Sequence, residues 1–492
     1  MTDQPPPPIN QWKTLDKDLG RIVQLEQALV YISRPMIAIS LGILFILICA
    51  VSAIILAGGS SSTVILVTAA AFGAYMALNI GANDVANNMG PAVGANALTM
   101  GGALIIAAVF ETAGALIAGG DVVSTISGGI VSPDAVADPD TFIWAMMASL
   151  LAAALWLNLA TWIGAPVSTT HSIVGGVMGA GIMAAGFGAV NWPTMGQIAA
   201  SWVISPLLGG LIAALFLSFI KAFINDVPDK IGAARKWVPV LIGVMAGAFS
   251  AYLAVKGLRR IVEINLTMGL ILGLAIGVAA TLITRPMVRR QSEGLENRKK
   301  SLKKLFAIPL VVSAALLSFA HGANDVANAV GPLAAIAHAV QEGGNGARVT
   351  IPLWVMIIGA AGISFGLVLF GPKLIRMVGG EITKLNPMRA YCVALSAAIT
   401  VIVASGLGLP VSSTHIAVGA VFGVGFYREW HAERKARLLG IEKGKPVAPD
   451  ERSRRKLVRR AHFLTIGAAW VVTVPMAAMM SALIFLALKA VS

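Results

Sequence analysis

Charged side chains are scarce in this chain. Asp, Glu, Lys and Arg make up 12% of its 492 residues, whereas an ordinary soluble domain carries about 25%. Hydrophobic residues account for 57%, and the mean hydropathy is +0.81. A chain of this composition contacts lipid rather than water over most of its surface. The composition therefore excludes a soluble enzyme of two or three domains.

Cysteine and the common hydrolase motifs are also scarce or missing. The two cysteines, Cys49 and Cys392, lie in apolar segments, which excludes a disulfide framework or a cysteine metal site. No HExxH or GxSxG motif accompanies the histidines, so an intramembrane hydrolase is disfavoured. We expect no catalytic residues, no resident metal and no cofactor. The first apolar run begins near Met36, after a tail with prolines at 5–8, so we expect no signal peptide.

Basic residues are in excess, giving a net charge of +14, but they are confined to a few polar segments. Aromatic residues that could stack on bases are not interleaved with them, so nucleic acid is not an expected partner. With the N-terminus in the cytoplasm, 32 of the 37 Lys and Arg fall on the cytoplasmic side, as the positive-inside rule requires. These 32 lie in the tail and in 221–236, 285–304, 373–389 and 428–460. The acidic loop 120–140 falls outside, and one loop, with Lys256, Arg259 and Arg260, disagrees with the assignment.

Apolar runs near the length of about 20 residues that crosses a bilayer predict an all-α, multi-pass membrane protein of the inner (cytoplasmic) membrane. Several are short or rich in glycine, which is typical of broken or re-entrant helices. The thirteen candidates are 36–57, 63–80, 98–119, 141–163, 167–187, 197–220, 237–255, 263–284, 305–320, 351–371, 388–407, 411–427 and 461–488.

Two motifs occur twice. GANDVANNMGP at 81–91 returns as GANDVANAVGP at 322–332, with nine of eleven positions identical, and PVSTTH at 166–171 returns as PVSSTH at 410–415. The copies begin seven spans apart, an odd number, so we expect inverted-topology repeats of about five spans each. A hairpin at 167–187 would change that count.

We therefore divide the chain into four parts. The segment 1–62 is a cytoplasmic tail with an accessory span, and 63–224 is the first transport repeat. The segment 225–304 holds connecting spans and a basic cytoplasmic linker. The second transport repeat is 305–492, with the basic loop 428–460, which we interpret as solvated.

Three acids lie within apolar spans or at their breaks: Asp84, Glu111 and Asp325. No Lys or Arg accompanies them. A carboxylate inside the membrane costs a few kcal/mol, so it suggests a function. The alternative is an acid that reaches a span end or pairs with a local amide. That alternative has more weight for Glu111 than for the two aspartates, each of which sits in a repeated motif.

Amides surround the two aspartates. If the glycine opens the backbone and a helix resumes, Asn83 faces Asn87 and Asp84 faces Asn88. Carboxylate, amide and backbone oxygens suit a small cation, and the aspartates could equally take up protons. Both interpretations fit the residues. The expected coupling residues are Asn83, Asp84, Asn87, Glu111, Asn324, Asp325 and Asn328.

Each PVS(S/T)TH motif predicts the start of a half-helix, because proline suits a first turn and disfavours helix before it. Its hydroxyls lie beside the free N–H groups of a helix start, a site suited to a tetrahedral oxyanion. A simple N-cap is the alternative. The expected oxyanion ligands are Ser168, Thr169, Thr170, Ser412, Ser413 and Thr414.

Three histidines accompany these motifs. His171 and His415 end the hydroxyl motifs and are as readily packed residues as proton carriers. His321 precedes the second GAND, where the first copy has Ile80, so a symmetric role is not expected. Because no Lys or Arg accompanies the site, a transported anion must be neutralised by co-transported cations, which predicts symport.

The paired GANDVAN and PVS(S/T)TH motifs resemble those of the PiT family of inorganic phosphate transporters, from about residue 63 to the C-terminus. The resemblance implies two re-entrant hairpins that meet phosphate at the centre. It implies that Asn83, Asp84, Asn324 and Asp325 hold the coupling cations and that the six hydroxyls contact phosphate. Sodium-coupled animal members have further membrane glutamates, whereas 389–400 has no acid here. Because bacterial relatives commonly use protons and carry metal–phosphate complexes, we favour protons over sodium.

Several alternatives stay open at this stage. A sulfate symporter of the same fold would be distinguished by competition between arsenate and sulfate. An anion channel would give uptake that is insensitive to ion gradients. The expected partners are phosphate, the coupling cation (H⁺ or Na⁺) and lipid, and a homodimer is a candidate assembly.

Overall fold

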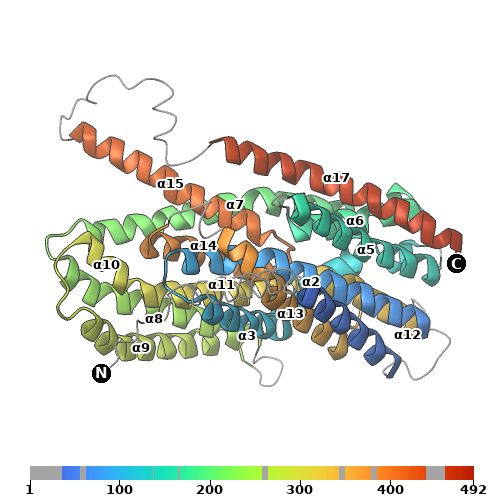
Figure 1. Cartoon of the computed structure of the whole chain (residues 1–492), viewed down its shortest axis with the longest axis horizontal. Coiled ribbons are helices and arrows are strands. Elements are labelled where there is room, and N and C mark those ends of the chain that lie inside the picture. The colour runs from blue at the N-terminus through green and yellow to red at the C-terminus, as the bar shows by residue number, and fades with distance from the viewer. Residues whose placement is uncertain are drawn as a thin grey trace, which may run out of the picture.

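The computed structural model describes residues 36–55, 63–136, 138–163, 167–257, 264–342, 349–377, 385–438 and 460–491. This part of the chain is helical, and its sole β pairing is one bridge between Val131 and Val190. The helices run roughly along the long axis of the molecule (Figure 1). The expected all-α membrane fold is confirmed. The tail before residue 36, Arg259, Arg260, Pro166 and most of the loop 428–460 lie outside the described residues.

The first half of the chain contains the helix Met36–Ile55, α2 (Thr63–Gly94), α3 (Met100–Ala118), α4 (Gly120–Ser124), the short turns η1 (Thr125–Gly129) and η2 (Pro133–Ala135), α5 (Pro139–Ile163), α6 (Thr169–Ala185), η3 (Phe187–Ala189), α7 (Trp192–Ile220) and η4 (Lys221–Asn225). The helices α8 (Lys230–Lys256), α9 (Leu266–Gln291) and α10 (Lys299–Leu305) follow. The second half contains α11 (Ala307–Asp325), α12 (Ala327–Glu342), α13 (Leu353–Met377), α14 (Pro387–Gly406), α15 (Ser413–Leu438) and α17 (Arg460–Val491).

Eleven helices of the described part are long and apolar enough to cross a membrane. They coincide with eleven of the thirteen runs expected from the sequence. The two runs that do not qualify as crossings are 167–187 and 411–427, which form α6 and the first part of α15.

These two helices are the returning arms of hairpins. In the first hairpin, α6 packs back along α5, and Val190 after α6 pairs with Val131, which precedes α5. In the second, α15 packs back along α14 and extends toward α10 (Figure 1). Each hairpin therefore enters and leaves at one end of the bundle, and its tip lies inside.

The hairpins preserve the odd separation between the two motif copies. Because α5 and α6 form one hairpin, both are removed together from the count of spans between the two copies. Removing two spans leaves that count odd, so the inverted topology expected from the sequence is unaffected. The hairpins also exchange partners between repeats: α6 packs on α17, and α15 packs on α7. The boundaries of the four sequence segments stay a prediction.

The two GANDVAN motifs differ in backbone. In the first copy, α2 continues as one helix through 81–88 and beyond Pro91, so the expected opening at the glycine is wrong there. Gly81 instead packs face to face with the backbone of Ile363 in α13. In the second copy the helix is interrupted at Val326, between α11 and α12. Only the second copy offers the broken helix expected of both.

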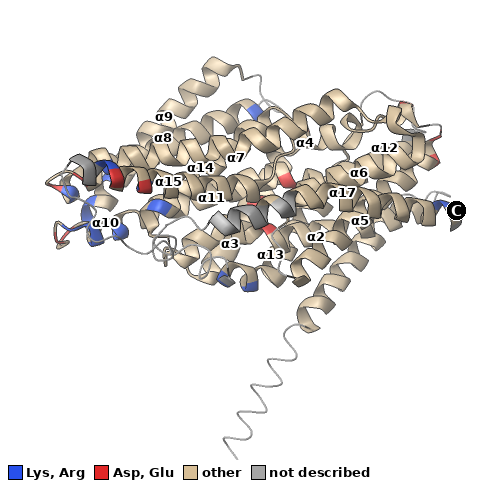
Figure 2. Cartoon of the chain, turned by 90° about the horizontal axis from the view of Figure 1, so that it is seen from above, with Lys and Arg blue, Asp and Glu red and all other residues tan. Residues whose placement is uncertain are grey.

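Charge separates along the bundle. Lys and Arg gather at the end where α10 lies, while the middle of the bundle is nearly free of charge (Figure 2).

Between the repeats, α8 and α9 form a close pair because glycines meet at their crossing: Gly243 and Gly247 face Gly273 and Gly277. Much of the outer face of α9 is apolar and exposed, as expected of a surface that contacts lipid.

Candidate functional site

The two hairpin tips meet the two GANDVAN motifs in the middle of the bundle. Helix α6 begins at Thr169, with the Ser168 hydroxyl accepting from the backbone N–H of His171 at 3.2 Å. Helix α15 begins at Ser413, and Ser412 accepts from the N–H of His415 at 3.3 Å. Both PVS(S/T)TH motifs thus start helices, as expected. Ser168 and Ser412 act as N-caps, so their hydroxyl oxygens are already engaged.

Asp84 is fully buried. Its carboxylate accepts a hydrogen bond from one hydroxyl of each hairpin. Thr169 of the first hairpin donates to its Oδ2 at 2.9 Å, and Thr414 of the second donates to its Oδ1 at 3.2 Å. The neighbouring Asn83 amide also donates to Oδ1, at 2.9 Å.

Asp325 has the symmetry-related set of partners and is equally buried. Ser413 of the second hairpin donates to its Oδ2 at 2.9 Å. The Thr170 hydroxyl of the first lies 3.4 Å from its Oδ1 and 3.0 Å from the carbonyl of Val411, so either oxygen can accept its hydrogen. Each aspartate therefore takes one hydroxyl from its own repeat and one from the other. The carboxylates are joined by hydroxyls that both halves supply.

The asparagines fall into two symmetric pairs. Asn87 donates to the Thr414 hydroxyl at 2.8 Å, and Asn328 donates to the Thr170 hydroxyl at 3.2 Å, across the repeats in each case. The other pair holds the tips: Asn83 donates to the carbonyl of Val167 at 3.4 Å, and Asn324 donates to the carbonyl of Leu409 at 3.1 Å.

Glu111 on α3 is also buried at this level of the bundle. Its Oε1 accepts from the Asn88 amide at 2.9 Å. The pairings expected within one helix, Asn83 with Asn87 and Asp84 with Asn88, are not the hydrogen bonds that form. Apart from the hydrogen bond between Asn83 and Asp84, these side chains bond to groups on neighbouring elements.

His321 lies at the centre of the site, although comparison of the two repeats within the sequence did not predict a symmetric role for it. Its Nε2 lies 2.8 Å from Asp325 Oδ2 and 3.6 Å from Asp84 Oδ2, and its Nδ1 lies 3.3 Å from Glu111 Oε2. The residue is completely buried. The sequence spacing could have predicted this contact, because His321 is four residues before Asp325 and therefore lies on the same face of the helix.

The other two histidines pack together. The rings of His171 and His415 are edge to face with centroids 4.4 Å apart, and Trp202 of α7 covers His171 at 3.8 Å. Trp202 in turn donates to the carbonyl of Pro410 in the second hairpin at 3.0 Å. These rings join the two tips to each other and to α7.

The assembled site can bind both signs of charge. One ligand atom from each of Asp84, His321 and Asp325 lies within 4.8 Å of the other two. A neutral imidazole would let one cation contact all three, whereas a protonated one would itself supply the positive charge. The hydroxyls of Thr169, Thr170, Ser413 and Thr414 converge from two helix starts and could donate to an oxyanion. Of the expected ligands, Ser168 and Ser412 alone lack a hydrogen bond to the carboxylates.

The chain is similar to known proteins over most of its length. The model of the phosphate transporter family matches residues 80–481. A Helicobacter pylori protein named "Putative phosphate permease" is 46% identical over 96% of this chain and 98% of its own length. The Arabidopsis thaliana protein "Inorganic phosphate transporter 2-1, chloroplastic" is 40% identical over 74% of this chain and 66% of its own. A solved structure titled "The sodium-dependent phosphate transporter" is 35% identical with a TM-score of 0.78, covering 87% of this chain and 100% of that one.

Proposed function

We propose a function from the premise that this chain belongs to the phosphate transporter family. The protein takes up inorganic phosphate by symport with protons across the cytoplasmic membrane. Its N-terminus and the basic end of the bundle would face the cytoplasm. The transport of phosphate follows from the family. The coupling, the direction and the roles of individual residues are our proposals.

The observation that carries the proposal is the competition for the hydrogens of these hydroxyls. Thr169, Thr170, Ser413 and Thr414 are the donors best placed for phosphate. Three of them, Thr169, Ser413 and Thr414, donate to Asp84 or Asp325. The Thr170 hydroxyl lies 3.4 Å from Asp325 Oδ1 and 3.0 Å from the carbonyl of Val411. A hydroxyl has one hydrogen to donate. It can therefore serve the carboxylate or the phosphate, but not both.

This competition links phosphate to a cation. Phosphate brings negative charge beside two buried carboxylates, and like charges in a medium of low dielectric repel strongly. When each carboxylate takes up a proton, it no longer needs the hydroxyl hydrogens, and the hydroxyls can turn toward phosphate. Loading of protons and loading of phosphate would thus favour one another, as symport requires.

His321 favours protons over sodium. Its Nε2 lies close to the facing oxygens of both aspartates, in the space where a sodium ion would have to contact the two carboxylates. The solved relative is named for sodium dependence, so both cations are compared directly in the test.

The test is uptake of labelled phosphate into liposomes that contain the purified protein. An inward proton gradient should drive accumulation without sodium, and a sodium gradient alone should not. Excess arsenate should compete with phosphate, and excess sulfate should not. Runs with and without Mg²⁺ show whether a metal–phosphate complex is carried. Uptake that ignores both cation gradients would contradict symport and favour an anion channel.

A further inference from the structure

The two halves of the site match closely except at one pair of positions. Gly81 in the first repeat packs on Ile363 of α13, and its partner Gly322 in the second repeat packs on Glu111 of α3. Ile363 is thus the spatial counterpart of Glu111. The residue before each glycine differs in the same way, with Ile80 in one half and His321 in the other.

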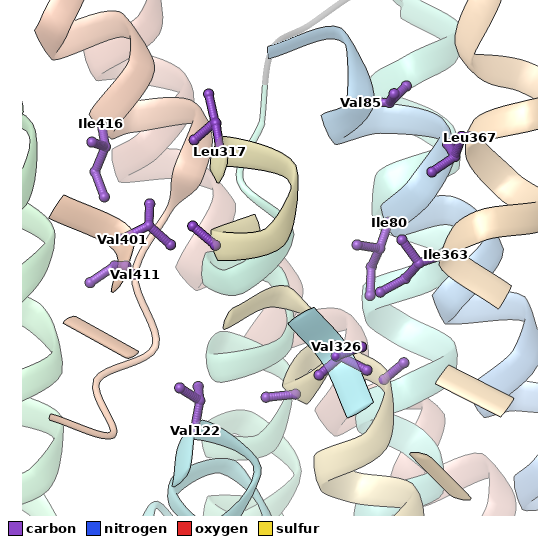
Figure 3. Packing of buried hydrophobic residues seen from close by; sticks show 14 of the residues in the cluster. Ile80, Val85, Val122, Leu317, Val326, Ile363, Leu367, Val401, Val411 and Ile416 are labelled. Carbon is purple, nitrogen blue, oxygen red and sulfur yellow. The ribbon is translucent and has the colours of Figure 1, made fainter. Parts of the chain in front are cut away.

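The first half therefore holds an apolar pair where the second holds a polar one. Ile80 and Ile363 lie side by side in the core (Figure 3) and are both buried. His321 and Glu111 are buried to the same degree, with Nδ1 and Oε2 3.3 Å apart. The apolar pair shows that this packing position does not require charge.

The contacts of His321 indicate its charge. One ring nitrogen lies 2.8 Å from Asp325 and the other lies 3.3 Å from Glu111. A neutral imidazole carries one N–H, so one lone pair would face a carboxylate. The imidazolium carries an N–H on both nitrogens and a positive charge, so both contacts then join opposite charges. Glu111 also accepts from the Asn88 amide through its other oxygen.

We propose that His321 and Glu111 form a resident ion pair that sets how many cations accompany each phosphate. This inference rests on the proposed symport. His321 supplies one fixed positive charge, and Glu111 offsets it, so the pair as a whole is neutral. The net charge left for co-transported cations to balance is that of Asp84, Asp325 and phosphate.

The charged groups around His321 are carboxylates, and no described Lys or Arg contacts the pair. The groups that face His321 from the elements packed around it are Asp84 of α2 and Glu111 of α3, beside Asp325 of its own helix. The nearby α4 and α8 bring Asp121 and Lys256, which pair with each other at 2.6 Å.

The experiment measures charge moved per phosphate, from currents and labelled uptake recorded on the same liposomes. His321→Gln leaves Glu111 unpaired and should raise the ratio by one positive charge. Glu111→Gln leaves His321 unpaired and should lower the ratio by one. The double variant His321→Ile/Glu111→Ile copies the pair at Ile80 and Ile363 and should return the ratio to the wild-type value. Loss of uptake in both single variants with recovery in the double variant would support the same conclusion.

The matched control is Ile80→Val/Ile363→Val, which should keep the wild-type ratio. Single variants that leave the ratio unchanged, or that shift it in the same direction, would overturn the ion pair. A double variant as impaired as the single variants would also overturn it. Wild-type protein that responds to no cation gradient would instead contradict the symport itself, so the two failures are distinguishable.

Discussion

Thr414 illustrates how single residues connect the two halves. Its hydroxyl accepts from Asn87 and donates to Asp84, both on α2, although Thr414 itself starts α15. The hydroxyl is therefore a relay between an amide and a carboxylate across the repeats. Thr170 repeats this arrangement with Asn328 and Asp325.

Removing the Thr414 hydroxyl should weaken phosphate binding. Thr414→Val keeps the shape of the side chain but loses a hydrogen bond to a charged group, worth about 1.5–3 kcal/mol. We expect the KM for phosphate to rise by roughly 10- to 100-fold, and Thr414→Ser should restore most of the loss. Thr400→Val is the control, because that buried hydroxyl bonds only the carbonyl of Ser396 in its own helix. Equal KM values for Thr414→Val and Thr400→Val would rule out a ligand role for Thr414.

The aspartates should be indispensable to coupling. Asp84→Asn and Asp325→Asn remove the carboxylates that take up the cation while keeping the size of the side chain, so gradient-driven uptake should be abolished. Membrane insertion, followed by the yield of monodisperse protein, should be retained. Normal gradient-driven transport in both variants would refute the assigned role.

At this scale the sequence predicted which residues meet but not how they bond. The repetition of GAND and of STTH identified both aspartates and four hydroxyls that contact them. The same symmetry argument missed His321, because Ile80 stands in its place. Because His321 has no counterpart in the first repeat, its role becomes apparent only in the structure, where Glu111 of α3 lies beside it.

At the scale of helices, small residues set how the hairpins are held. Gly175 and Gly179 bring α6 against the backbone of α17, and Gly419 and Gly423 bring α15 against the backbone of α7. Each returning arm is thus supported by the other repeat. Close backbone approach through small residues is the usual basis of helix packing in membranes.

A methyl group at these crossings should separate the helices. A Cβ at Gly179 or Gly423 would meet the backbone of Ala478 or Gly210, so Gly179→Ala and Gly423→Ala should each destabilise by about 1–3 kcal/mol. The measurement is thermal unfolding in detergent. Gly196→Ala on α7 is the control, because nothing lies within 4 Å of the added methyl, and it should be neutral or slightly stabilising. Equal melting temperatures for all three variants would show that the close contacts do not matter.

The element pattern was largely predictable, and its errors have one cause. Apolar length identified all eleven described helices that are long and apolar enough to cross a membrane, but it also counted the returning hairpin arms at 167–187 and 411–427. A half-helix buried among other helices is as apolar as a crossing one. The continuity of α2 could not be foreseen either, because Gly81 serves a helix crossing and not a break.

On the scale of the whole molecule, the distribution of charge predicts orientation. Lys and Arg gather at the end around α10 (Figure 2), whereas Asp134 and Asp138 lie in the loop before α5. With the N-terminus in the cytoplasm, a cysteine at Lys303 should be shielded from an impermeant thiol reagent in intact cells. A cysteine at Asp134 should react. Labelling at Lys303 with protection at Asp134 would reverse the topology.

The scarcity of charge in the membrane leads to the central claim of this account. At the centre of the bundle, three carboxylates surround His321, and no Lys or Arg of the described residues contacts them. A phosphate that enters this site must therefore bring its counter-charge with it. A pore would have no such requirement.

The sign of the charge that moves with phosphate tests this claim most directly. Liposomes that contain the purified protein are adsorbed to a sensor electrode, and phosphate is added in a rapid step at equal pH and sodium on both sides. We predict that phosphate entry carries no net negative charge into the liposomes, and that any positive signal is lost in Asp84→Asn. A negative charge carried inward with phosphate would mean that the anion crosses alone and would contradict the account.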